Sequence, residues 1–144
     1  MLELHYDMGT SVSAIGNHEF DHGIQVLLEN FIQSKNKIKW VCSNIHLKKQ
    51  KASVIRKRYK VNFKDIVIHD VVMVELKGRK IGIFALLDKN TKKKMSETNR
   101  KDFLQVFEME EDIKEVSERC VKKLKEQGAD FIIAIANMDG YYSE

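Results

Sequence analysis

The feature that most constrains this sequence is a strand-to-helix junction near the start of the chain, where a dense polar turn separates two apolar segments. Residues 12–15 form a short apolar stretch typical of a strand, and residues 24–32 place their apolar side chains at helical spacing. Between them, residues 16–23 read Gly-Asn-His-Glu-Phe-Asp-His-Gly. Loops at strand ends in α/β sheets converge on a crevice where ligands bind. The turn therefore places an amide, imidazoles and carboxylates where a site is expected.

Strand and helix patterns alternate along the rest of the chain, which indicates an α/β fold. We expect one largely parallel sheet with helices on its faces. Its strands are predicted at residues 11–15, 39–43, 81–86 and 131–136, and its helices at residues 24–32 and 110–127. The strand at 131–136 is apolar throughout and is predicted to be fully buried.

The connecting segments carry turn signals and charge. Residues 1–7 are predicted to be the end of a helix that leads into the first strand. Residues 46–64 are polar and basic, and we interpret them as an inserted loop with a strand at 54–61. The turn at 77–80 predicts a β-hairpin that joins residues 66–76 to the following strand.

Composition limits the class of protein. The length of 144 residues fits one domain with its own core. The net charge is +4, but the lysine clusters at 48–51 and 92–94, the second in a lysine-rich loop, lack interleaved aromatic residues, which disfavours a nucleic-acid partner. Cys42 and Cys120 lie in apolar patterns and are predicted to be buried free thiols. No apolar run is long enough for a membrane span and no signal peptide is visible, so a cytoplasmic location is the default expectation.

The polar turn also carries a family resemblance. Gly-Asn-His-Glu-Phe-Asp at 16–21, followed by Gly23, resembles the Asn-His-Glu signature of the metallophosphoesterase (calcineurin-like phosphatase) superfamily, and the longer string is most similar to the 5′-nucleotidase branch. The resemblance extends over residues 4–142 and implies a layered α/β fold with a mostly parallel sheet flanked by helices. It also implies hydrolysis of a phosphate monoester, such as a nucleotide, with two divalent metal ions (Zn, Mn or similar). Members of this branch often work outside the cytoplasm.

By this resemblance, Asn17 would be a metal ligand, and His18 and Asp21 would be the catalytic pair. A histidine can donate a hydrogen bond to phosphoryl oxygens, where charge accumulates in the transition state. A carboxylate on the other ring nitrogen fixes the orientation and tautomer of the ring. Two alternatives remain: Asp21 caps the following helix, and His18 is a solvated loop residue. His22 adjoins the motif and either lines the site or is solvated.

The sequence departs from the family pattern after the last strand and upstream of the turn. Asn137 stands where the family presents a metal-binding histidine, and we keep it as a candidate metal ligand, although an amide is a poor substitute for imidazole with Zn or Mn. The Asp-x-His, Gly-Asp and Gly-His-x-His motifs of the family do not occur. We therefore expect residues 1–144 to be a partial metallophosphoesterase catalytic domain, either a fragment or a degenerate copy, that is not competent alone. The alternative is a non-catalytic α/β binding or scaffold domain.

Overall fold

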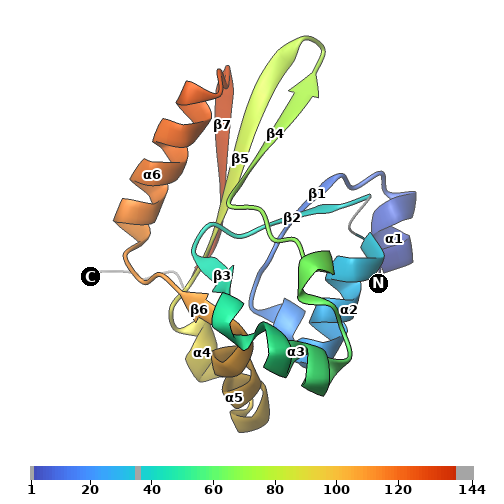
Figure 1. The fold of residues 1–144 in the computed structure, drawn as a ribbon. Helices are drawn as coiled ribbons and strands as arrows, with labels where there is room; N and C mark the ends of the chain where they lie inside the picture. The colour runs from blue at the N-terminus through green and yellow to red at the C-terminus, as the bar shows by residue number, and fades with distance from the viewer. Residues whose placement is uncertain (1, 35–36, 139–144) are drawn as a thin grey trace.

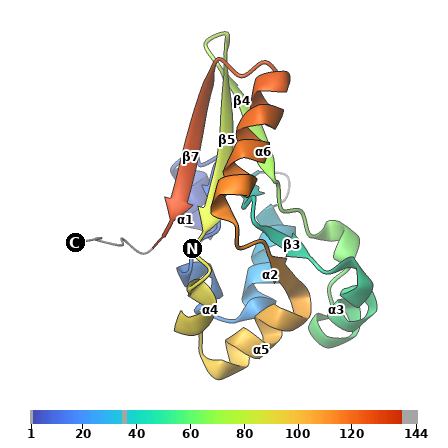
Figure 2. The same cartoon turned by 90° about the vertical axis from the view of Figure 1, so that its left-hand side faces the viewer.

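The computed structural model describes residues 2–34 and 37–138, which form two connected parts (Figure 1). The part that we call the body contains α1 (Leu2–Asp7), β1 (Val12–Ala14), the 3-10 turn η1 (His18–Phe20), α2 (Ile24–Ser34), β2 (Lys39–Val41), β3 (Ile45–Leu47), η2 (Lys49–Lys51), α3 (Ala52–Tyr59), η3 (Phe63–Asp65), α4 (Thr91–Lys94), α5 (Glu97–Val106) and β6 (Phe107–Met109). The part that we call the blade contains β4 (Val71–Leu76), β5 (Arg79–Leu87), α6 (Ile113–Glu126) and β7 (Phe131–Asn137). Figure 2 shows α6 lying along the blade's sheet.

The expected α/β class is confirmed, but the prediction of one continuous sheet is wrong. β1 pairs with β2 in parallel, β5 pairs with β7 in parallel, and β4 pairs with β5 in antiparallel. These strands belong to two separate ladders, β1-β2 and β4-β5-β7, and β3 pairs with β6 in a third. A single parallel bridge, between Val41 and His69, connects β2 to the segment that precedes β4.

The ladder is interrupted because side chains replace backbone pairing where β2 approaches β5. The Ser43 backbone N–H still donates to the Ala85 carbonyl at 2.7 Å. One residue later, the buried Asn44 amide accepts from the Leu87 N–H at 2.9 Å and donates to the Leu87 carbonyl at 2.8 Å. The two ladders are thus held side by side through a buried polar link rather than as one sheet. Apolar contact among Val41, Val72 and Ala85 completes the junction.

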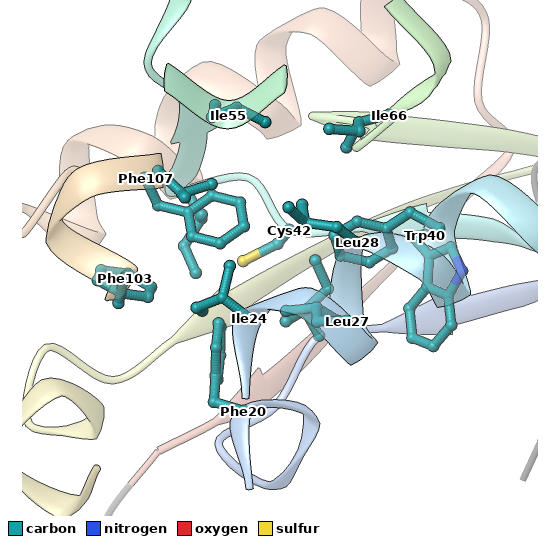
Figure 3. Close-up of a cluster of buried hydrophobic side chains, with 14 of the residues drawn as sticks. Phe20, Ile24, Leu27, Leu28, Trp40, Cys42, Ile55, Ile66, Phe103 and Phe107 are labelled. Carbon is teal, nitrogen blue, oxygen red and sulfur yellow. The ribbon is translucent and has the colours of Figure 1, made fainter. Parts of the chain in front are cut away.

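The core of the body is built on α2, and Figure 3 shows its buried side chains. The predicted helix is confirmed and extends to Ser34. Its inward face, Ile24, Leu27, Leu28 and Phe31, is 0–1% exposed and packs with residues from β2, α3 and α5. At the end of the helix, the buried Ser34 hydroxyl accepts from the Trp40 indole N–H at 2.7 Å, so α2 is fixed to β2.

The segment predicted to contain a strand at 54–61 is instead helical, so that prediction is wrong. α3 spans Ala52–Tyr59 because Ile55 and Tyr59, four residues apart, share one buried face of a helix. The helix ends at Lys60, which adopts a left-handed conformation with φ of 55°. The lysine-rich stretch at 92–94 also differs from the expected loop, because it forms the short helix α4.

In the blade, the helix predicted at 110–127 is confirmed with a later start. α6 begins at Ile113 because the Asp112 carboxylate caps it, accepting from the Glu115 N–H at 3.0 Å. Its apolar stripe of Val116, Cys120 and Leu124 packs on β5. The hairpin predicted between β4 and β5 is also confirmed, with positive φ at both of its turn residues, 77 and 78.

The prediction that residues 131–136 are fully buried is wrong. β7 is an edge strand, and α6 covers only the face that carries Ile132. Phe131, Ile133 and Ile135 on the other face are 58%, 47% and 38% exposed. An apolar run cannot by itself distinguish a strand covered on both faces from one covered on a single face.

The body and the blade meet at a polar joint centred on Arg119 of α6. The guanidinium donates to both carboxylate oxygens of Glu110, at 2.7 and 3.0 Å, and to the Ser43 carbonyl at 3.0 Å. His46 contacts the same carboxylate, and Asp70 lies 3.5 Å from the guanidinium. Hydrogen bonding from Arg119 holds the pKa of Glu110 below its usual range. This network fixes α6 to the end of β2 and to β6.

Cys42 and Cys120 are buried free thiols, as predicted. Burial raises the pKa of Cys42 to about 12 and also raises the pKa of Cys120, so neither is poised as a thiolate nucleophile. The predicted helix at the start of the chain is present as α1. Within the described residues, the helices are too short or too polar to cross a bilayer.

Candidate active site

The polar turn lies at the carboxyl end of β1 and is held there by one buried ring. Phe20, 1% exposed, packs edge-on against Phe103 of α5 at 5.3 Å and Phe107 of β6 at 6.3 Å between ring centroids. The Asn99 side chain of α5 also donates to the Phe20 carbonyl at 2.9 Å. Figure 3 shows the Phe20 ring within the cluster of buried side chains. Because Phe20 is anchored there, His18 and Asp21 on either side of it remain exposed in a fixed turn.

His18 and Asp21 lie within hydrogen-bonding distance. The His18 Nδ1 atom is 2.8 Å from the Asp21 Oδ2 atom, and the two side chains are 81% and 59% exposed. With Nδ1 turned toward the carboxylate, Nε2 is the ring nitrogen left to face a ligand. The geometry required for the predicted pair is therefore present, and the catalytic roles of the two residues stay a prediction.

Asn137, at the end of β7, lies beside the turn although it is 120 residues away from Asn17 in sequence. Its side-chain oxygen accepts from the Asn17 backbone N–H at 3.1 Å. Glu19 accepts from the Gly16 N–H at 2.6 Å. A Cβ atom at Gly16 would lie 3.0 Å from the Glu19 carboxylate and 3.2 Å from the Asn137 amide, so a side chain at this position would crowd both groups. The structure thus brings the two candidate metal ligands together, but Asn137 uses its amide oxygen to position the turn.

The donors that the described residues offer do not fit a two-metal centre. Among the residues that the structure describes, there is no group of three or more His, Cys, Asp or Glu side chains placed to hold a metal ion. His46 is engaged by Glu110 at the polar joint. His22 is exposed and, with His5 and His18, lines a hollow of about 500 Å³. One turn with two asparagines cannot replace the several ligands that a dinuclear site takes from different loops.

A second hollow, of about 480 Å³, opens directly beside the His18–Asp21 pair. One wall is the polar turn, and the opposite wall comes from the segment that leads from α4 into α5, with Thr91, Lys94, Ser96 and Asn99. Ser96 caps α5 by accepting from the Asn99 N–H at 3.2 Å. The sequence interpretation missed this wall because it treated residues 92–94 as a loop. The serine ahead of a helical run was the signal that could have revealed the start of α5.

The chain is similar to known proteins in its structure but not in the comparisons based on its sequence. No protein-family model and no curated protein matches the chain. Solved structures do match it: a 5′-nucleotidase precursor from Thermus thermophilus (22% identity, TM-score 0.64), a calcineurin-like phosphoesterase from Bacillus subtilis (19%, 0.64) and the NAD nucleotidase of Haemophilus influenzae (24%, 0.56).

The matches cover most of this chain but a minor part of each relative. They cover 93%, 94% and 87% of this chain, and 22%, 37% and 19% of the respective structures. At these identities the likeness establishes the fold. By fold, the chain is similar to part of the 5′-nucleotidases and calcineurin-like phosphoesterases.

Proposed function

We propose that the chain is part of a metal-dependent phosphomonoesterase domain of the 5′-nucleotidase type and supplies the side of the active site that contacts the phosphate. The observation that carries this proposal is the 2.8 Å contact between His18 Nδ1 and Asp21 Oδ2 at the carboxyl end of β1. The fold supports it, because structures similar to this chain belong to a nucleotidase and a phosphoesterase. The substrate class is a phosphate monoester, with nucleotides as the first candidates.

His18 would act by hydrogen bonding. When its ring is protonated, Asp21 accepts from Nδ1–H and Nε2–H points toward the phosphoryl oxygens of a substrate in the adjacent hollow. Donors aimed at oxygens that gain charge in the transition state lower the barrier. Asp21 would orient the ring through its contact with Nδ1. The short distance between the two groups and the anchored Phe20 beneath them keep this arrangement in place.

Divalent metals belong to the proposal through the family resemblance, and the described residues do not supply enough ligands for them. We therefore expect the chain alone to retain metal poorly and to hydrolyse nucleotides little. A non-catalytic binding or scaffold domain is the second candidate. The observation that favours it is the Asn137 side chain, which takes the place of the expected histidine and hydrogen bonds to the Asn17 backbone.

The test follows the imidazole of His18 by ¹⁵N NMR during titration with inorganic phosphate and with AMP. We expect saturable shifts of the His18 ring nitrogens, which His22→Gln leaves unchanged because that histidine is outside the hollow beside the pair. The absence of any response at His18 would reject the phosphate-contacting role and favour the scaffold.

Metal content after dialysis, and phosphate release from AMP with added Mn²⁺ or Zn²⁺, test the second part of the proposal. Weak retention and little turnover are expected. Two tightly held ions per chain with multiple turnovers, abolished by His18→Ala, would show that the chain is a competent enzyme by itself.

A further inference from the structure

One short segment carries a high local concentration of positive charge. Residues 48–65 contain eight lysines and arginines against one acidic residue, Asp65. The whole chain has a net charge of +4, so the remainder of the sequence is net acidic. Such a concentration on one segment creates a local field that attracts anions.

The fold gathers part of this charge around a hollow. Because Ile55 and Tyr59 are buried, α3 turns Arg56 and Lys57 outward. The left-handed Lys60 ends the helix, after which η3 follows. Between α3 and η3 lies a hollow of about 570 Å³, whose lining includes Ser53, Arg56, Lys57, Asn62, Phe63 and Lys64.

Both walls of the hollow are fixed by contacts behind them. On the far side of α3, Arg58 binds the Asp102 carboxylate at 2.5 Å and the Gln105 amide at 3.1 Å, which ties the helix to α5. In the other wall, the Asn62 side chain caps η3 by accepting from the Lys64 N–H at 3.2 Å. Asp65 lines a neighbouring hollow with Tyr59. Among the described residues, the lining of the hollow between α3 and η3 therefore contains three cationic side chains and no carboxylate.

We propose that this hollow, which we call the α3 hollow, binds a polyphosphate group with three or four negative charges. An arginine can bind phosphate oxygens in a bidentate manner, and lysines add point charges. The volume lies in the range of about 300–1,000 Å³ that is typical of small-molecule sites. Single-stranded nucleic acids are bound on several successive aromatic rings. The lining offers one ring, Phe63, so a small ligand fits better than an RNA or DNA strand.

The experiment measures binding of ATP, inorganic tripolyphosphate and AMP to the full chain by calorimetry, at low salt and at about 0.15 M salt. ATP and tripolyphosphate are expected to bind at least tenfold more tightly than AMP. Arg56→Ala, Lys57→Ala and Lys64→Ala should each weaken ATP binding about tenfold, because each removes a charge-assisted contact. Lys114→Ala is the matched control, since it removes one exposed lysine from α6, far from this lining.

The ligands and variants separate the possible outcomes. Equal binding of ATP and tripolyphosphate supports a site for the phosphate chain alone, whereas tighter binding of ATP that Phe63→Leu abolishes supports a nucleotide site. An equal loss of binding in Lys114→Ala, or a single-stranded RNA that binds more tightly than ATP through the same three residues, would overturn the proposal. His18→Ala should leave ATP binding at the α3 hollow unchanged, so this site and the proposed active site fail independently.

Discussion

The body and the blade are built from similar elements, but their apolar side chains are buried to different extents. In the body, α2, α3 and α5 enclose one apolar cluster in which the inward residues of α2 are 0–1% exposed. In the blade, α6 covers one face of the sheet, and β7 exposes Phe131 and Ile133 on the other. Figure 1 shows the same contrast, with helices gathered around the body and the sheet formed by β4, β5 and β7 extending from it.

This difference matters because the candidate site takes residues from both parts. Phe20 anchors the polar turn in the body, whereas Asn137 reaches the turn from the end of a blade strand. Damage to the body should therefore destroy the turn itself. Damage to the blade should release only the Asn137 contact and leave His18 and Asp21 together.

Among the substitutions considered, Phe20→Ala in the body is expected to lower the free energy of unfolding the most. The ring is 1% exposed and contacts two other aromatic rings, so its loss should lower the free energy of unfolding by about 3–5 kcal/mol. Urea denaturation measures the change. Leu104→Ala, on the same helix α5 as Phe103 and 49% exposed, is the control and should change the free energy of unfolding by less than about 0.5 kcal/mol. Similar values for both variants would contradict the description of the body as the tightly packed part.

Gly82→Ala in the blade should have a smaller effect. A Cβ atom there would lie 2.7 Å from Leu124 Cδ2, so the buried Leu124 side chain, or α6 with it, would have to shift. Overpacking of this kind costs about 1–3 kcal/mol. Hydrogen exchange should show faster exchange in α6 while α2 keeps its protection.

Leu124→Ala provides the control for the Gly82 substitution because it removes the clashing side chain. In that background, Gly82→Ala should cost much less than it does alone. If the two substitutions are instead additive, the clash between Gly82 and Leu124 is not the reason for the glycine.

The sequence predicted elements whose signal is local. α2 and α6 were found from one buried stripe each, and the hairpin turn at Lys77 and Gly78 from its turn residues. The broken sheet could not be found in this way, because the link through Asn44 depends on a contact with Leu87, 43 residues away. The exposure of β7 depends likewise on which neighbours cover it.

The same limit applies to the candidate site. The Asn-His-Glu turn and the spacing of His18 and Asp21 are local, so the sequence predicted them as a unit. The contact of Asn137 with Asn17 and the wall formed by α4 and α5 are set by the tertiary fold. A search for metal ligands in sequence could propose Asn137 but could not show that its amide oxygen accepts from a backbone N–H.

Arg119→Lys tests the joint between the two parts. A lysine cannot hold both oxygens of Glu110 and the Ser43 carbonyl at once, so the free energy of unfolding at pH 7 should fall by about 1 kcal/mol, a value reduced for the partial exposure of the pair. Lys114→Ala, which removes an exposed 4.0 Å pair with Glu118, should have no measurable effect.

The pH dependence sharpens this test. Arg119 keeps the pKa of Glu110 below its usual value of 4.5 in the folded state. A lowered carboxyl pKa stabilises the fold at pH values above 4.5, and this contribution is lost as the pH falls through the folded-state pKa. The difference in stability between the wild type and Arg119→Lys should therefore shrink below about pH 4.5. A difference that stays constant down to pH 3 would mean that Arg119 acts through packing rather than through Glu110.

The smallest effect on stability is expected for Asp21→Asn. His18 and Asp21 are 81% and 59% exposed, and an exposed ion pair contributes about 0–1 kcal/mol, so the free energy of unfolding should change by less than about 0.5 kcal/mol. The response of the His18 ring to phosphate should nevertheless weaken severalfold, because the ring loses the carboxylate that orients it. Glu29→Gln, which removes the same charge from a pair on α2 with Gln25, should leave this response intact. If Asp21→Asn leaves the phosphate response of His18 unchanged while folding normally, Asp21 does not orient the ring, and the pair has the geometry of the proposed site without its function.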